Sequence, residues 1–167
     1  ELLKKFPPRP LPDFHQVKYN GCHRQTVPPH AFPYSRILST GKAESMKLTP
    51  THMFAHYDDI TPAFLQSIGV RALLIDIDNT LAPYEQESPD ERLHAWLGSL
   101  REAGIRVALV SNNHAPRVEK FNESLGLPAY ADSRKPFKKN MLRAMRELGA
   151  SPEETAVLGD QLLTDAY

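Results

Sequence analysis

The sequence predicts one α/β domain built on a doubly wound parallel sheet. Apolar runs of strand length recur from residue 70 onward, and segments with helical periodicity lie between them. Capping residues and glycines bound these helical segments. The chain has 167 residues and a hydrophobic content of 41%, which is enough for one core and too little for two comfortable ones. We therefore expect one active site.

The first strand and the first helix follow each other along the chain. Residues 70–75 form a nearly continuous apolar run, which is typical of a strand that is covered on both faces. Before the helix, Ser88 and Pro89 predict an N-cap and a first helical residue, and Glu91 predicts a capping box. The apolar side chains that follow at helical spacing are Leu93, Trp96, Leu97 and Leu100. Gly104 ends the helix.

Three more strands and two more helices complete the pattern. The strands are expected at residues 105–110, 129–131 and 155–158. The next helix carries Val118, Phe121 and Leu125 and stops at Gly126, and the helix after Pro136 has Phe137, Met141, Met145 and Leu148 on one face and stops at Gly149. Strands that alternate with helices of this length imply right-handed crossovers, and such sheets bind ligands at the carboxyl ends of their strands.

Residues 1–45 differ in composition from the rest. They contain seven of the fifteen prolines and show no apolar periodicity, so we expect them to be disordered. Residues 41–45 are spelled largely by purine-rich codons, as a ribosome-binding leader would be, and well-patterned sequence starts at Met46. We therefore interpret residues 1–45 as a leader that is not part of the natural protein, and residues 46–167 as its core. A targeting peptide is the alternative, because residues 1–45 carry seven Lys/Arg against three Asp/Glu.

The composition excludes several kinds of partner and site. The 20 basic and 20 acidic residues give no net charge that would favour nucleic acid as a partner. Cys22 is the only cysteine, which excludes a disulfide framework and fits a cytoplasmic location. No apolar run approaches the roughly 20 residues that span a bilayer, so any membrane contact would be peripheral. Residues 53–57, with Ile60 and Phe64, either touch a bilayer or pack on the core.

Carboxylates follow the first and the fourth predicted strand. Asp76 and Asp78 leave the first strand on the same side, because alternate residues of an extended chain point the same way. Asp160 and Asp165 follow the fourth strand. Carboxylates that are brought together would repel one another, so we expect them to bind a hard, oxygen-preferring cation such as Mg²⁺.

Groups that suit an anion follow the other two strands. Ser111 and Asn112 offer a hydroxyl and backbone N–H groups where a helix is about to begin, and Lys135 supplies a positive charge. Each motif alone has a simpler explanation, since such aspartates occur in turns, such serines cap helices and most lysines are solvated. Their occurrence at four strand ends favours a single site for Mg²⁺ and a phosphate.

These motifs resemble those of the haloacid dehalogenase superfamily. Motifs I to IV correspond to Asp76-Ile77-Asp78-Asn79-Thr80, Ser111-Asn112, Lys135-Pro136 and Gly159-Asp160-Gln161-Leu162-Leu163-Thr164-Asp165. The form of motif IV and the lead-in across residues 48–70 are similar to the YqeG-type branch, which is itself similar to mitochondrial and plastid phosphatidylglycerophosphate phosphatases. The resemblance covers residues 46–167.

The resemblance implies a magnesium-dependent phosphatase with a role for each motif. Asp76 would be the nucleophile that becomes a phospho-aspartate, and Asp78 would be the general acid and base. The phosphate would be bound by Ser111, Lys135 and the amide of Asn112, with Thr80 as a secondary contact. Magnesium would be held by Asp76, the backbone carbonyl of Asp78, Asp160 and Asp165, the last directly or through water.

The spacing of the motifs bears on the substrate. Only 34 residues separate Asp76 from Ser111 and 23 separate Ser111 from Lys135, so neither gap can hold a cap domain. The resemblance then implies the capless subclass IIIA and a membrane lipid phosphate, phosphatidylglycerophosphate, as the substrate in phospholipid synthesis. A soluble nucleotide or phosphosugar is an alternative substrate, and a non-catalytic magnesium-dependent interaction module is an alternative function.

The end of the sequence leads to one more expectation. Superfamily sheets of this type continue through another helix and a fifth strand, in the spatial order 5-4-1-2-3. We therefore expect a C-terminally truncated core that lacks this helix and strand. Residues 156–158 would then form an unprotected apolar edge of the sheet.

Overall fold

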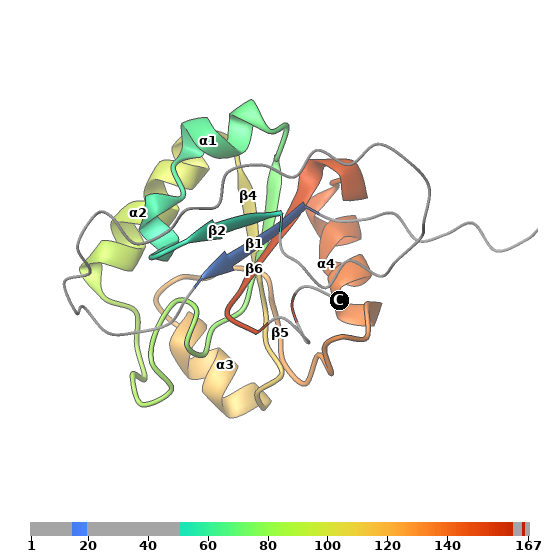
Figure 1. Cartoon of the computed structure of the whole chain (residues 1–167). Helices are drawn as coiled ribbons and strands as arrows, with labels where there is room; N and C mark the ends of the chain where they lie inside the picture. The colour runs from blue at the N-terminus through green and yellow to red at the C-terminus, as the bar shows by residue number, and fades with distance from the viewer. Residues whose placement is uncertain (1–14, 20–50, 162–164, 166–167) are drawn as a thin grey trace, which may run out of the picture.

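The computed structural model describes residues 15–19, 51–161 and 165. They form a parallel sheet with helices on both faces (Figure 1). The strands, in their order across the sheet, are β2 (His52–Phe54), β1 (His15–Tyr19), β6 (Thr155–Gly159), β3 (Ala72–Ile75), β4 (Arg106–Val110) and β5 (Ala129–Tyr130). Every neighbouring pair is parallel, so the carboxyl ends of the strands lie along one edge of the sheet.

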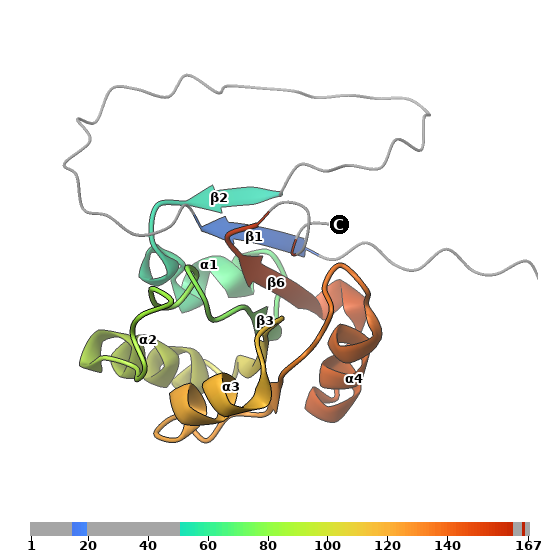
Figure 2. The same ribbon diagram turned by 90° about the horizontal axis from the view of Figure 1, so that it is seen from below.

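Helices cover the two faces of the sheet unequally. They are α1 (Pro62–Ser67), α2 (Glu91–Glu102), α3 (Ala115–Asn122) and α4 (Lys139–Leu148), with the short 3-10 helices η2 (Tyr57–Asp59) and η3 (Pro152–Glu154). The helices α1, α2 and α3 pack on one face and α4 on the other (Figure 2). This arrangement confirms the predicted doubly wound α/β fold.

The sequence of the central strand β3 is apolar throughout because helices cover both of its faces. Leu73 and Ile75 point into the core under α1, α2 and α3, whereas Leu74 points into the core under α4. All three side chains are fully buried. A strand that is covered on both faces has no position for a polar side chain, and the first one follows directly after it at Asp76.

Two helices begin later than the sequence predicted. The N-cap of α2 is Asp90, whose carboxylate accepts a hydrogen bond of 2.8 Å from the Leu93 N–H, and not Ser88. Both residues are good N-caps, and the spacing alone could not rank them. The helix α4 begins at Lys139, so Phe137 precedes it in a turn and is 72% exposed instead of lying on the apolar helix face.

The neighbour of β6 comes from the segment that was expected to be disordered. Strand β1 lies between β6 and β2, so the predicted unprotected edge at residues 156–158 is instead paired with residues 15–17. The free N–H and C=O groups of a strand edge can pair with any extended segment, which explains how a strand without apolar periodicity joins the sheet. The other residues of the expected leader, Cys22 among them, lie outside the described part of the chain, as does Met46.

The segment before β3 packs on the core. Tyr57 and Ile60 are buried, and the Trp96 ring lies 5.1 Å from that of Tyr57 and donates a hydrogen bond of 2.9 Å to the Ile60 carbonyl. Met53 is exposed in β2. The sequence left open whether this segment touches a bilayer or packs on the core, and Tyr57 and Ile60 pack on the core. Within the residues that the structure describes, no helix is long and apolar enough to cross a membrane.

Candidate active site

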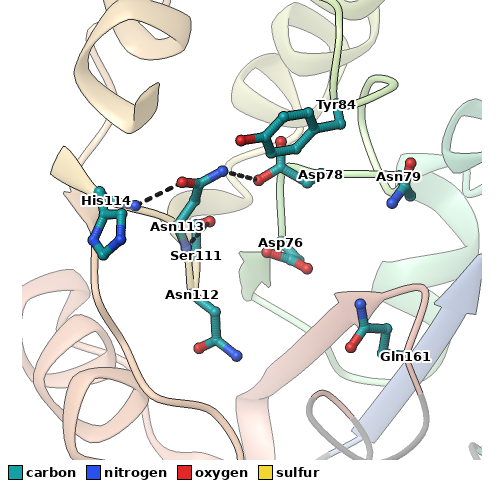
Figure 3. Close-up of a pocket in the computed structure, with 9 residues that line it drawn as sticks. All are labelled: Asp76, Asp78, Asn79, Tyr84, Ser111, Asn112, Asn113, His114 and Gln161. Carbon is teal, nitrogen blue, oxygen red and sulfur yellow. Dashed lines mark hydrogen bonds between the residues drawn. The ribbon is translucent and has the colours of Figure 1, made fainter. Parts of the chain in front are cut away.

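The predicted polar residues meet at the carboxyl edge of the sheet. Asp76, Asp78, Ser111 and Asn112, but not Lys135, Asp160 or Asp165, are among the described residues that line an open pocket of about 430 Å³ (Figure 3). It is lined by Asp76, Asp78, Asn79, Tyr84, Ser111, Asn112, Asn113, His114 and Gln161. Asp76 follows β3, Ser111 follows β4 and Gln161 lies two residues after β6, so neighbouring parallel strands deliver these groups to one place.

A buried lysine joins two of the predicted carboxylates. Lys135 Nζ lies 2.9 Å from Asp76 Oδ1 and 2.6 Å from Asp165 Oδ1, and the lysine side chain is 2% exposed. Burial raises the pKa of Asp76 to about 6. The attraction of Lys135 lowers this pKa, and the repulsion of Asp165 raises it, but burial has the largest effect. Without a further positive charge, the nucleophile predicted from the sequence is therefore in an unfavourable place for a carboxylate.

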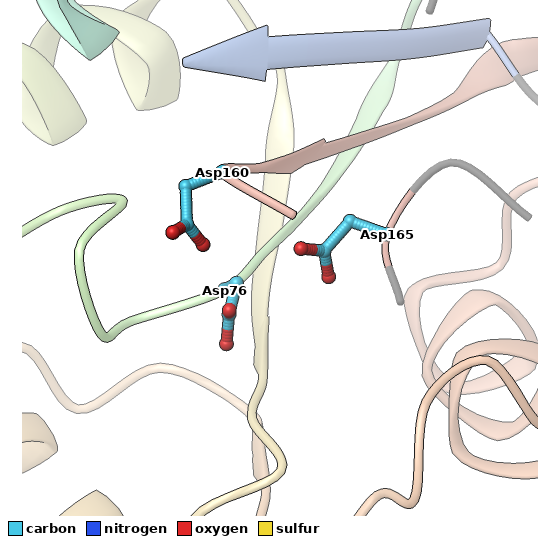
Figure 4. Close-up of side chains that lie close together, drawn as sticks. All are labelled: Asp76, Asp160 and Asp165. Carbon is cyan, nitrogen blue, oxygen red and sulfur yellow. The ribbon is translucent and has the colours of Figure 1, made fainter. Parts of the chain in front are cut away.

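Three carboxylates converge beside this lysine. Oxygen atoms of Asp76, Asp160 and Asp165 all lie within 4.8 Å of one another (Figure 4). Burial, and then the charge of Asp165, raises the pKa of Asp160. The ammonium of Lys135 offsets one of the three negative charges, which leaves a set of hard oxygen donors whose charge a divalent cation would balance. This donor set fits Mg²⁺ chemically.

The backbone at Gly159 lies very close to the side chain of Asp165. A Cβ on Gly159 would lie 2.2 Å from the Cγ of Asp165, so only glycine leaves room for that carboxylate. Thr80 is buried and its hydroxyl donates a hydrogen bond of 3.4 Å to Asp160 Oδ1. Leu162, Leu163 and Thr164 of the predicted fourth motif lie outside the described residues.

The carboxylate of Asp78 has different partners. Its Oδ2 accepts a hydrogen bond of 3.0 Å from Asn113 Nδ2, and its Oδ1 accepts bonds of 3.2 and 3.1 Å from Arg117 Nε and Nη2. Among the described residues, the Asp78 side chain is not part of the cluster of carboxylates that could hold a metal. The expectation that Asp78 binds metal through its backbone carbonyl stays a prediction.

Ser111 and Asn112 occupy the loop after β4. Ser111 is buried, and its Oγ accepts a hydrogen bond of 3.0 Å from the Asn113 N–H, which leaves the hydroxyl proton available to another acceptor. The Asn112 side chain forms two hydrogen bonds with the backbone of Lys135, of 2.6 Å to its N–H and 3.3 Å to its carbonyl. The visible role of the Asn112 side chain is thus to position the lysine.

The sequence did not single out several residues of this region. Arg117 was missed, because its contact with Asp78 joins residues 39 positions apart in the sequence. Tyr84, which lines the pocket and is exposed, gave no signal at all. His114 had no role assigned, and it also lines the pocket, with its Nδ1 2.7 Å from Asp132 Oδ1.

Sequence comparisons identify known proteins that are similar to this chain. A family model described as haloacid dehalogenase-like hydrolase matches residues 34–166. A probable phosphatase of Bacillus subtilis, YqeG, is 42% identical over 106 residues, which make up 64% of this chain and 62% of the relative, so the chain spans less than two thirds of that protein's length. The predicted likeness to YqeG is thereby confirmed.

One solved structure shows the same fold, and a second is a weaker match. A hypothetical protein from Xanthomonas campestris has a TM-score of 0.50 and 23% identity, and the match covers 61% of this chain and 64% of that one. The cobalt-bound deoxy-D-mannose-octulosonate 8-phosphate phosphatase from Haemophilus influenzae has a TM-score of 0.49 and 20% identity over 55% of this chain and 59% of that one. On the match of the family model to most of its length, the chain belongs to the haloacid dehalogenase-like hydrolase family.

Proposed function

We propose that this protein is a magnesium-dependent phosphomonoesterase that works through a phospho-aspartate on Asp76. The main support is the position of Asp76 in the lining of an open polar pocket, in contact with Lys135 and close to two further carboxylates. A nucleophile for phosphoryl transfer needs this combination of a reactive oxygen and fixed positive charge.

The metal would be held by residues of three segments. Carboxylates of Asp76, Asp160 and Asp165 offer the oxygen donors, and the backbone carbonyl of Asp78 is the fourth candidate ligand. Bound Mg²⁺ would neutralise negative charge on the phosphoryl group and the carboxylates. Lys135 and the Ser111 hydroxyl would stabilise the remaining phosphoryl oxygens.

The chain's own residues then account for two chemical steps. In the first, an oxygen of Asp76 attacks phosphorus, the bond from phosphorus to the leaving oxygen breaks, and Asp78 donates a proton to that oxygen, which releases an alcohol. In the second, Asp78 takes a proton from a water molecule whose oxygen attacks phosphorus. The bond between phosphorus and Asp76 breaks, and inorganic phosphate leaves.

A membrane lipid phosphate is the substrate that we propose. The pocket is open, the turn that carries Lys135 also exposes Arg134 and Phe137, and Lys139 is exposed at the start of α4. An exposed aromatic ring with flanking cations suits an anionic bilayer surface. Together with the resemblance to phosphatidylglycerophosphate phosphatases, this favours phosphatidylglycerophosphate, dephosphorylated by a peripheral enzyme at the cytoplasmic face of the membrane during phospholipid synthesis.

Hydrolysis assays test the activity and the substrate separately. Phosphate release would be measured from phosphatidylglycerophosphate in vesicles and from soluble nucleotides and phosphosugars, with Asp76→Asn as the inactive control. We expect release from the vesicles by the wild type alone. Higher kcat/KM on a soluble compound would overturn the lipid assignment, and release that is unchanged in Asp76→Asn would overturn the proposed mechanism.

A further inference from the structure

Arg117 makes a two-point contact with the proposed proton-transfer group. It lies in the first turn of α3, and its Nε and Nη2 donate hydrogen bonds of 3.2 and 3.1 Å to one oxygen of Asp78. Both side chains are largely buried, with 15% of Arg117 and 17% of Asp78 exposed. An ion pair at this depth is less screened and more tightly oriented than one on the surface.

Arg117 contacts Asp78 but does not itself line the pocket among the described residues. Asp78 and Asn113 line the pocket, whereas Arg117 is not among its described lining residues. The guanidinium lies 5.2 Å from the centroid of the Phe121 ring, which is fully buried. Among the described contacts, Arg117 packs on a core aromatic ring and reaches the pocket residues through Asp78.

Asn113 holds the other oxygen of the same carboxylate. Its Nδ2 donates a bond of 3.0 Å to Asp78 Oδ2, and its own Oδ1 accepts a bond of 2.8 Å from the His114 N–H, which fixes the orientation of the amide. Both oxygens of Asp78 are thus bound, one by a rigid guanidinium fork and one by a fixed amide. The carboxylate can rotate only by breaking at least one of these contacts.

We propose that Arg117 is the positioning residue for Asp78 and holds its carboxylate where it exchanges protons with the leaving oxygen and with water. This inference rests on the proposed function and adds a residue to it. A displacement of about 1 Å of a catalytic group can lower a rate by about a hundredfold, so an anchored guanidinium in this place affects turnover without contacting substrate.

The test compares Arg117→Met and Arg117→Lys on two substrates, an alkyl phosphate and p-nitrophenyl phosphate. For Arg117→Met on the alkyl phosphate, we expect kcat to fall about 10- to 100-fold while KM changes less than about twofold. With p-nitrophenyl phosphate, whose leaving group needs little protonation, the first step stays fast and the second is slowed. A burst of p-nitrophenol and accumulation of phospho-aspartate should then appear. Arg117→Lys should recover part of kcat, because it restores the charge but not the fork.

Two further variants separate positioning from stability. Arg143→Met is the matched control, because Arg143 also pairs with a carboxylate, Glu147, and lies over a ring, that of Tyr130, but on α4. It should leave kcat unchanged. The double variant Arg117→Met/Asp78→Asn should be no slower than Asp78→Asn alone, since both changes remove the same function. Thermal melts of every variant identify any loss that comes from unfolding.

The outcomes distinguish the two proposals. A kcat of Arg117→Met within twofold of the wild type, an equal loss in Arg143→Met, or additive losses in the double variant would each overturn the positioning role. Turnover by Asp76→Asn that equals that of the wild type would instead overturn the proposed function.

Discussion

Replacing the proposed nucleophile by its amide, Asp76→Asn, should make the metal-free protein more stable at neutral pH. Burial raises the pKa of Asp76 from 3.8 to about 6, and this value already includes the attraction of Lys135. Between these two pH values the folded state binds more protons than the unfolded state, so the stability of the wild type falls as the pH rises through that window and stays lower above it. At about 1.4 kcal/mol per pH unit, the cost approaches about 3 kcal/mol at pH 7.

The amide carries no charge and avoids this cost. Lys135 loses one partner in Asp76→Asn but keeps Asp165, whose Oδ1 lies 2.6 Å from its Nζ. The variant should therefore gain up to about 3 kcal/mol in the free energy of unfolding at pH 7.5 and almost nothing at pH 4. Urea unfolding in EDTA at both pH values measures this difference. Glu119→Gln, which removes an exposed carboxylate of α3, is the control and should change little at either pH.

Added magnesium should reverse or narrow the difference in the free energy of unfolding between Asp76→Asn and the wild type. A metal at a hundred times its Kd stabilises a protein by about 2.7 kcal/mol, and the wild type keeps the full set of carboxylates. If Asp76→Asn is less stable than the wild type in EDTA at pH 7.5, or gains equally at both pH values, the view of Asp76 as a buried, electrostatically unfavourable carboxylate is incorrect.

Three further predictions concern the same site. Asp78→Asn should retain phosphate binding but lower turnover by about two to four orders of magnitude, the range for a lost general acid and base, and a wild-type rate in steady-state assays would mean that another group moves the proton. EDTA should remove phosphatase activity and magnesium should restore it, whereas full activity in chelator would contradict the role given to Asp160 and Asp165. Gly159→Ala should weaken magnesium binding, measured by calorimetry, and lower activity at least about tenfold, because the new Cβ would lie 2.2 Å from the Asp165 Cγ; unchanged affinity would show that Asp165 can move without consequence.

The parts of the fold that were predictable depend on local pattern. The apolar run that became β3 is buried on both sides of the sheet, so its composition alone identified a central strand. The site residues were predictable for a related reason. Polar side chains that directly follow parallel strands lie at the carboxyl edge of the sheet, and Asp76 and Ser111 are both found there.

The parts that were not predictable depend on tertiary contacts. Strand β1 has no pattern of its own that identifies it, and it is defined by pairing with β6 and β2. The contact between Arg117 and Asp78 joins residues 39 positions apart, so no local periodicity reveals it. Phe137 fitted the helical spacing of Met141, yet the turn that carries Lys135 ends beyond it, with the Phe137 N–H bound to the Arg134 carbonyl.

The loop after β4 has a larger structural role than its motif suggests. Asn112 holds the backbone of Lys135, and Asn113 holds the carboxylate of Asp78, which Arg117 binds from the helix that follows. One short segment therefore orients both the fixed positive charge and the proposed proton-transfer group, which come from different parts of the chain. Because Lys135 in turn contacts Asp76, a shift of this loop would disturb the proposed nucleophile and the proposed acid together. The geometry of the site thus depends on the loop before α3 and on the first turn of that helix, as well as on the strand that the two aspartates follow.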